Sequence, residues 1–129
     1  MRYNGHVLRQ GPLSAFLHGV IEYLAGVLFI AAPFLFSFDS DAAVAISILA
    51  GVLILVVTAS SELPTSLITV IPVMTHVVLD FAFSGLLIAT PFLFGFAEET
   101  APTAFFIVLG VAHVLITIAT RFLAPRSPA

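Results

Sequence analysis

Two histidine–carboxylate pairs are the residues of this chain whose types and spacing suit chemistry. His18 lies four residues before Glu22, and His76 lies four residues before Asp80. In an α-helix, residues four apart share one face, so each pair places an imidazole beside a carboxylate. Such groups bind transition metals and hold or pass protons. Both pairs lie in otherwise apolar segments, where ionisable side chains are costly and usually face the interior of a helix bundle.

An internal repeat relates the two pairs. When the sequence is shifted by 58 positions, residues 76–96 align with residues 18–38, and ten of the 21 aligned positions are identical. The two histidines then coincide, and so do the two carboxylates. The second halves of the two copies also correspond, at an offset of 59 positions. One unit was therefore used twice, and the two pairs are expected at the same depth on two related helices.

The composition is that of an integral membrane protein. Of the 129 residues, 60% are hydrophobic and only 9% are charged, and the mean hydropathy is +1.20. A soluble domain of this size needs a charged coat, because its surface is large relative to its core. The apolar runs instead have the length of ~20 residues that spans a hydrocarbon core. The net charge of −3 gives no nucleic-acid-binding signature, and the sequence contains no cysteine from which to infer disulfides.

The predicted fold class is all-α, a four-transmembrane-helix bundle built from two tandem two-helix repeats. A single membrane domain is expected over residues 1–129, with repeat one at 13–60 and repeat two at 72–123. The four spans are expected, by their apolar runs, at 13–36, 42–60, 72–94 and 102–123. Residues 66–71 are expected to form a short interfacial piece before the third span.

Each copy of the repeat carries a proline near the far end of its first span. Pro33 and Pro91 both precede the same Phe-Leu-Phe sequence. Proline removes a backbone hydrogen-bond donor and clashes with the preceding helical turn. Both prolines are therefore expected to bend or end their helices at the same depth.

The pattern around these prolines resembles the SPW-repeat family of small bacterial membrane proteins. The resembling segments are Ala32-Pro33-Phe34 with Phe38, and Thr90-Pro91-Phe92 with Phe96. The family's name motif has Ser, Pro and Trp, whereas this chain has Phe in the aromatic position and no Trp. The resemblance implies a two-span repeat and a membrane location. It implies no activity and brings no functional residues to this chain.

The placement of charge predicts the orientation in the membrane. All four arginines lie near the two ends of the chain, at Arg2, Arg9, Arg121 and Arg126. The turns at 39–41 and 98–99 carry acidic side chains and no arginine. Four spans place both ends on the same side of the membrane. The positive-inside rule then predicts a multi-pass protein of the cell membrane with its N- and C-termini in the cytoplasm.

The candidate functional residues are five ionisable side chains: His18, Glu22, His76, Asp80 and His113. His113 belongs to the fourth span and reaches a similar depth. Three functions suit the group: a metal site at His18, Glu22, His76 and Asp80, a haem held by two histidines, or a proton or ion path. A structural role competes with them, in which each histidine bonds the carboxylate of its own helix and fixes helix packing. Di-iron bundles use the spacing Glu-x-x-His with additional Glu, whereas this chain has His-x-x-x-Glu.

The sequence favours a non-enzymatic structural or accessory subunit with a buried His/carboxylate cluster. The alternatives are a proton- or ion-conducting transport protein that uses the cluster, and a metal- or haem-binding membrane redox protein. An enzyme is not favoured, because the sequence has no Gly-rich phosphate loop, nucleophile elbow or zinc-protease motif. The expected partners are the lipid bilayer, other membrane subunits or a second copy of the chain, and no nucleic acid. No cofactor is the first expectation, with a metal ion or haem b as the alternatives.

Overall fold

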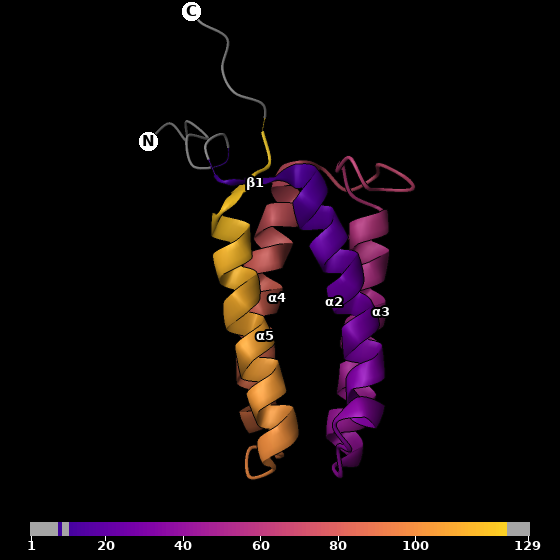
Figure 1. Ribbon diagram of the computed structural model, residues 1–129, viewed down its shortest axis with the longest axis vertical. Coiled ribbons are helices and arrows are strands. Elements are labelled where there is room, and N and C mark those ends of the chain that lie inside the picture. Colours follow the sequence, from indigo (N-terminus) through magenta and orange to yellow (C-terminus); the bar gives the residue numbers. More distant parts are fainter. Residues whose placement is uncertain (1–7, 9–10, 124–129) are drawn as a thin grey trace, which may run out of the picture.

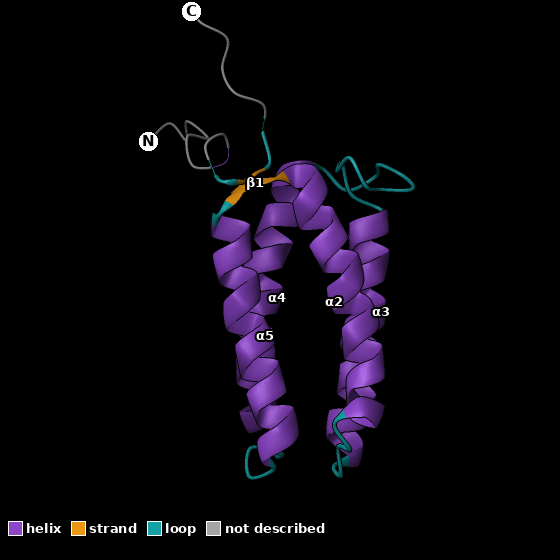
Figure 2. Cartoon of the chain, viewed as in Figure 1, coloured by secondary structure: helices purple, strands orange, loops and turns teal. Residues whose placement is uncertain are grey.

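The chain forms two helical hairpins that stand side by side. The computed structural model describes Leu8 and residues 11–123. Its elements are, in chain order, β1 (Leu13–Ser14), α2 (Ala15–Leu35), α3 (Asp41–Ala59), α4 (Val73–Leu93), α5 (Thr100–Ile118) and β2 (Thr120–Arg121) (Figure 1, Figure 2). Helix α2 packs along α3, and α4 packs along α5, so that each repeat is one hairpin.

The outward faces of the helices are suited to lipid. All four helices are long and apolar enough to cross a membrane. Leu24, Val56 and Leu115 have exposed fractions of 66%, 56% and 61%. Such faces would form a large uncovered apolar surface in water, whereas in a bilayer they contact acyl chains. The predicted bundle of four transmembrane helices in two tandem repeats is confirmed, and the protein contacts the bilayer as a multi-pass membrane protein.

Small residues allow the two helices of each hairpin to approach closely. A Cβ atom added to Gly51 of α3 would lie 2.5 Å from the carbonyl oxygen of Gly26 on α2. At the equivalent position of the second repeat, a Cβ on Gly110 would lie 3.0 Å from the carbonyl oxygen of Ser84. Close backbone approach gives van der Waals contact, which is a main source of helix association in a membrane.

Pro33 and Pro91 lie in the last turns of α2 and α4, and each helix ends two residues later. The carbonyl oxygen of each proline accepts a hydrogen bond, at 3.0 Å, from the backbone N–H five residues further on. The turns then pass through a left-handed residue, Ser37 with φ of 50° and Gly95 with φ of 76°. This conformation commonly closes a helix. The two repeats therefore turn at the same place and in the same conformation.

The fourth span is shorter at its C-terminal end than the sequence predicts. Helix α5 ends at Ile118 and not near Leu123, because β2 leaves the helix and pairs in parallel with β1. Arg121 also donates hydrogen bonds to the carbonyls of Gly11 and Pro12, at 2.8 and 3.1 Å. These contacts hold residues 11–14 and residues 120–121 together at one end of the bundle. The span also begins slightly earlier than predicted, at the start of α5.

The segment between the hairpins, including residues 66–71, is not helical and folds back over the end of α3. The N–H groups of Val70 and Ile71 donate to the carbonyl oxygen of Ser60, at 3.1 and 2.9 Å. These bonds satisfy a carbonyl that the helix end leaves free. Leu67 and Val70 are 84% and 70% exposed, so apolar side chains project at the end of the bundle.

Contacts at the opposite end fix the hairpins relative to each other. Phe29 of α2 packs edge-to-face against Phe105 of α5, with ring centroids 4.8 Å apart. The carboxylate of Glu99 accepts hydrogen bonds from the backbone N–H groups of Asp39 and Ser40, at 2.6 and 2.9 Å. These contacts join the two hairpins at a level that is further from β1 and β2 than the ionisable side chains are.

Candidate functional site

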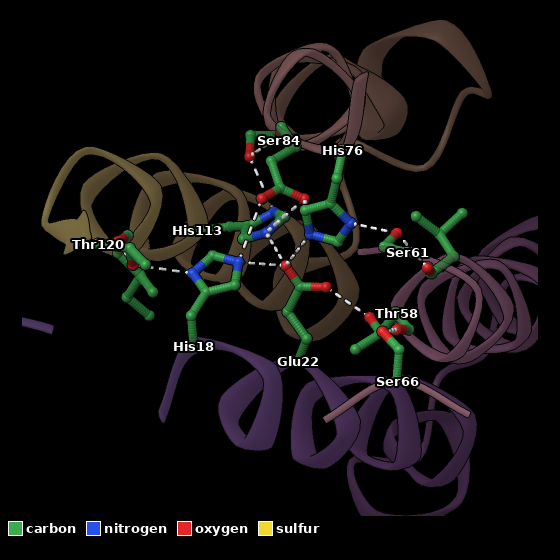
Figure 3. Close-up of polar contacts among 12 residues, drawn as sticks. His18, Glu22, Thr58, Ser61, Ser66, His76, Ser84, His113 and Thr120 are labelled. Atoms are coloured by element: carbon green, nitrogen blue, oxygen red, sulfur yellow. Dashed lines mark hydrogen bonds and ion pairs between the residues drawn. The ribbon is translucent and has the colours of Figure 1, made fainter. Parts of the chain in front are cut away.

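The five candidate side chains converge at one place between the hairpins, as Figure 3 shows for His18, Glu22, His76 and His113. This place lies near the end of the bundle where β1 and β2 pair, since His18 contacts Thr120 of β2. His18 and Glu22 come from α2, His76 and Asp80 from α4, and His113 from α5. The two histidines of the repeat are fully buried, and both carboxylate residues are 4% exposed. The carboxylates face the bundle interior and not lipid, as their cost in a membrane requires.

Each repeat histidine contacts the carboxylates of both repeats. His18 Nε2 bonds the Glu22 carboxylate and lies 3.1 Å from Oδ2 of Asp80. His76 Nε2 lies 3.0 Å from Oε1 of Glu22 and 3.2 Å from Oδ1 of Asp80. The sequence interpretation in which each histidine bonds only its own helix therefore describes half of these contacts. The other half joins the two hairpins.

His113 adds a third imidazole on one side of this symmetric group. Its Nε2 atom lies 3.5 Å from Oε1 of Glu22 and 3.6 Å from Oδ1 of Asp80. These separations are longer than ordinary hydrogen bonds. Within the described residues, the buried His113 Nε2 has no hydrogen-bond partner. In the 59-residue register of the repeat, His113 stands where the first repeat has Ile54.

The Nδ1 atom of each of the three histidines forms a hydrogen bond with a hydroxyl group. Thr120 Oγ1 lies 2.9 Å from Nδ1 of His18, and Ser61 Oγ lies 2.7 Å from Nδ1 of His76. These two hydroxyls occupy equivalent positions of the repeat, and each lies just after the last helix of the other hairpin. They were not predicted, although their shared register was a signal that could have identified them.

The third hydroxyl belongs to Ser84 of α4, and its oxygen lies 3.0 Å from Nδ1 of His113. Ser84 stands where the first repeat has Gly26, so the hydroxyl and the third histidine are both specific to the second repeat. It also lies one helical turn beyond Asp80, on the same face of α4. Neither member of this pair has a polar counterpart in the first repeat.

The hydroxyls determine where the protons on the histidines lie. Each of the three already donates its single proton to the backbone carbonyl four residues earlier, at 2.6 Å in every case. A hydroxyl has one hydrogen to donate, so its oxygen accepts from the imidazole. All three Nδ1 atoms therefore carry a proton. In a neutral imidazole, Nε2 then presents a lone pair, and all three lone pairs point toward the two carboxylates.

This arrangement requires positive charge at its centre. Lone pairs and carboxylate oxygens repel each other at contact distance, and burial in an apolar surrounding strengthens the repulsion. A bound cation, or protons added at Nε2, would supply the charge. Thr58 donates its hydroxyl proton to Oε2 of Glu22, which leaves Oε1 free to face the centre. The site can thus hold either a metal ion or a set of shared protons.

The spacing of the ligand atoms is compatible with a single ion. One ligand atom from each of His18, Glu22, Asp80 and His113 lies within 4.8 Å of the others. The sequence prediction named His76 and not His113 as the second imidazole of a metal site. His113 belongs to this compact set, and Nε2 of His76 also lies within 3.2 Å of both carboxylates. The structure therefore brings together all five candidates.

The family model described as the SPW repeat domain matches residues 16–120. No curated protein and no solved structure matches the chain. The matched range contains both helical hairpins, all five converging side chains and the three hydroxyls that hold the imidazoles. The chain therefore belongs to the SPW-repeat family, as the pattern around its two prolines predicts.

Proposed function

We propose that this membrane protein binds one divalent first-row transition metal ion inside its helix bundle. The proposed ligands are His18, Glu22, Asp80 and His113, whose ligand atoms lie within 4.8 Å of one another, and His76 bonds both carboxylates beside them. The observation that carries the proposal is the shared orientation of the imidazoles. Each has Nδ1 bonded to a hydroxyl and Nε2 directed at the same two carboxylates. Metal-binding histidines are typically held in this way, with the second ring N–H donating to a fixed acceptor.

Charge balance favours a divalent ion. Two carboxylates and three neutral imidazoles carry a charge of −2, which a divalent cation cancels. A net charge would be costly here, because the group is buried in a bundle that lipid surrounds. Two protons on His18 and His76 would also neutralise the carboxylates. That alternative leaves the lone pair of His113 facing the carboxylates with no proton between them, whereas a metal ion would take this lone pair as a ligand.

The donor set narrows the type of metal. Imidazole with carboxylate suits zinc, iron, manganese and their neighbours. Calcium and magnesium prefer oxygen ligands alone, and this site has three nitrogen donors. Haem is disfavoured by the geometry, because the Glu22 carboxylate contacts both repeat histidines in the space where a porphyrin would lie. The metal would supply Lewis-acid or redox chemistry, and its ligands would join three helices of the two hairpins.

Metal titration of the purified protein tests the proposal. Chelator-treated protein in detergent is titrated with Zn²⁺, Mn²⁺ or Fe²⁺ in separate calorimetric experiments, and the bound metal is quantified by elemental analysis. We expect one ion per chain. The double variant Glu22→Gln and Asp80→Asn keeps the shape of the site and removes its charge, so we expect it to stay helical and to lose the ion.

A matched control separates this effect from a general loss of polarity in the bundle. Tyr23 of α2 donates its hydroxyl to the carbonyl of Thr65, at 2.9 Å, and does not contact the site. The second repeat has Phe81 at the equivalent position. Tyr23→Phe should therefore bind metal as the wild type does. Equal metal binding by the wild type and the double variant would instead assign the cluster to hydrogen bonding between hairpins.

A further inference from the structure

A cavity of about 320 Å³ opens beside the converging side chains, between α3 and α4. Glu22, Asp80 and His113 lie at its inner side. The rest of its lining is apolar and comes from two helices, with Leu53 and Val57 on α3 and Leu79, Phe83 and Leu86 on α4. This volume lies within the range of binding sites for small molecules. The cavity therefore combines an apolar wall with a small, buried group of polar atoms.

A second cavity lies at the position that the repeat relates to the first, and it is nearly closed. It lies between α2 and α5, also contacts Glu22 and His113, and has a volume of about 50 Å³. A space of that size is suited to little more than water. Positions that are equivalent in the repeat line the two cavities, such as Val57 in the larger and Ile116 in the smaller. The symmetric ligand set is thus accessible from one side, because the two repeats differ in the side chains around it.

The larger cavity opens toward the bilayer. Leu53, Leu79 and Leu86 line it and are 45%, 39% and 51% exposed, and they lie on the outward faces of membrane-spanning helices. Ala82, at the rim, is also exposed. A molecule that reaches the polar group by this route must therefore dissolve in lipid and pass between α3 and α4.

We propose that this cavity binds a neutral, lipid-soluble molecule that carries a hydroxyl or carbonyl oxygen at one end. The oxygen faces His113 and the two carboxylates, and the apolar body contacts Phe83 and the leucines of α3 and α4. The proposal rests on the metal site for the role of this oxygen, which is that of an additional metal ligand. With a divalent ion bound, the centre is electrically neutral. A charged head group would leave net charge in an apolar surrounding, so a neutral oxygen is preferred over a carboxylate or an amine.

Three naphthalene probes test the class of ligand. 1-Naphthol carries a neutral oxygen, 1-naphthoate carries an anion on the same ring system, and naphthalene carries no oxygen. Each is titrated by calorimetry into metal-loaded full-length protein in phosphatidylcholine nanodiscs, and the signal from empty nanodiscs is subtracted. We expect 1-naphthol to bind at least about tenfold more tightly than either other probe, because only it brings a neutral ligating oxygen. Equal affinities for 1-naphthol and 1-naphthoate would overturn the proposal.

Cavity-filling variants test the place of binding. Ala82→Phe fills the rim, and Val57→Phe fills the interior from α3. Each should weaken 1-naphthol binding about tenfold or more while the metal content stays at one ion per chain. The control is Leu24→Phe. Leu24 is the counterpart of Ala82 in the first repeat, its side chain is 66% exposed, and it lines neither cavity. Unchanged 1-naphthol binding in both folded cavity variants would contradict the assignment.

The two proposals fail in different ways. Metal binding without preferential 1-naphthol binding would overturn the ligand proposal and leave the metal site standing. Preferential 1-naphthol binding that the cavity variants weaken, in protein that holds no metal, would support the cavity and contradict the role of the oxygen as a metal ligand. Metal content is measured on the same samples, so the two results are read independently.

Discussion

His113 and Ser84 form a hydrogen-bonded pair, Nδ1 to Oγ at 3.0 Å, at the two positions where the first repeat has Ile54 and Gly26. The pair therefore exists only in the second repeat. It adds a third imidazole to a ligand set that is otherwise two-fold symmetric. The asymmetry adds to the shared orientation of the imidazoles as a reason to interpret the cluster as a binding site, because two histidines and two carboxylates already suffice to join the hairpins.

Removing the hydroxyl of Ser84 should weaken metal binding without removing a ligand. Ser84→Ala leaves the His113 ring free to rotate and to change its protonated nitrogen. Loss of such a supporting contact typically lowers metal affinity by about 10–100-fold. Titration calorimetry with Zn²⁺ measures the change. The control is Thr90→Ala, which removes a hydroxyl that donates to the carbonyl of Leu86 on the same helix, away from the site. Equal losses in the two variants would show that His113 is not held for metal binding.

Gly51→Ala should destabilise the first hairpin. The added methyl group would lie 2.5 Å from the carbonyl oxygen of Gly26, and backbone atoms cannot move aside cheaply. We expect the free energy of unfolding to fall by about 1–3 kcal/mol, the usual cost of overpacking. Unfolding in mixed detergent micelles, followed by circular dichroism, measures it. A Cβ on Gly85 would have no atom within 4 Å, so Gly85→Ala is the control and should not destabilise. Similar destabilisation by both changes would refute the close approach of α2 and α3.

Ser37→Gly should stabilise the protein. Ser37 has a φ of 50°, and its counterpart in the second repeat is Gly95, with a φ of 76°. A left-handed conformation costs a residue with a Cβ roughly 1–2 kcal/mol, and glycine avoids that cost. We expect the midpoint of thermal unfolding to rise for Ser37→Gly and to fall for the reverse change, Gly95→Ser. Midpoints that move in the opposite directions would contradict the conformations of the two turns.

Both termini should lie in the cytoplasm. The pairing of β1 with β2 places residues 13–14 and residues 120–121 at one end of the bundle, and Arg121 lies there. The other three arginines, Arg2, Arg9 and Arg126, fall outside the described residues. A reporter that is active only in the cytoplasm should work when fused after Ala129 and should be silent when inserted within 97–100. Activity in the turn and silence at the C-terminus would reverse the orientation.

The helices and the depth of the ionisable pairs could be predicted from the sequence, because both depend on local patterns. Apolar length indicates a span, and the His-x-x-x-carboxylate spacing places two side chains on one face. The contacts of His18 with Asp80, and of His76 with Glu22, could not be predicted in this way. They depend on how one hairpin packs against the other, which no spacing within a helix encodes.

The contacts of the hydroxyls with the histidine rings could not be predicted from local sequence patterns either. The predicted fourth span at 102–123 includes Thr120, whereas the structure places this residue in β2, beyond the end of the helix. Ser61 lies between the predicted second and third spans, where a hydroxyl side chain is unremarkable. Their equivalence becomes visible only when the 59-residue register of the repeat is combined with the positions of the two histidine rings. The larger cavity could not be inferred either, since it results from different side chains at equivalent positions of the two repeats.

X-ray absorption spectroscopy of the metal-loaded protein tests the central claim most directly. The measurement reports the type and distance of the atoms around the ion. With Zn²⁺ bound at one ion per chain, we predict nitrogen and oxygen neighbours at about 2.0–2.2 Å, together with the outer-shell scattering of imidazole rings. The imidazole contribution should fall in His113→Ala. A bound ion surrounded by oxygen alone, or an imidazole signal that His113→Ala leaves unchanged, would contradict the proposed site.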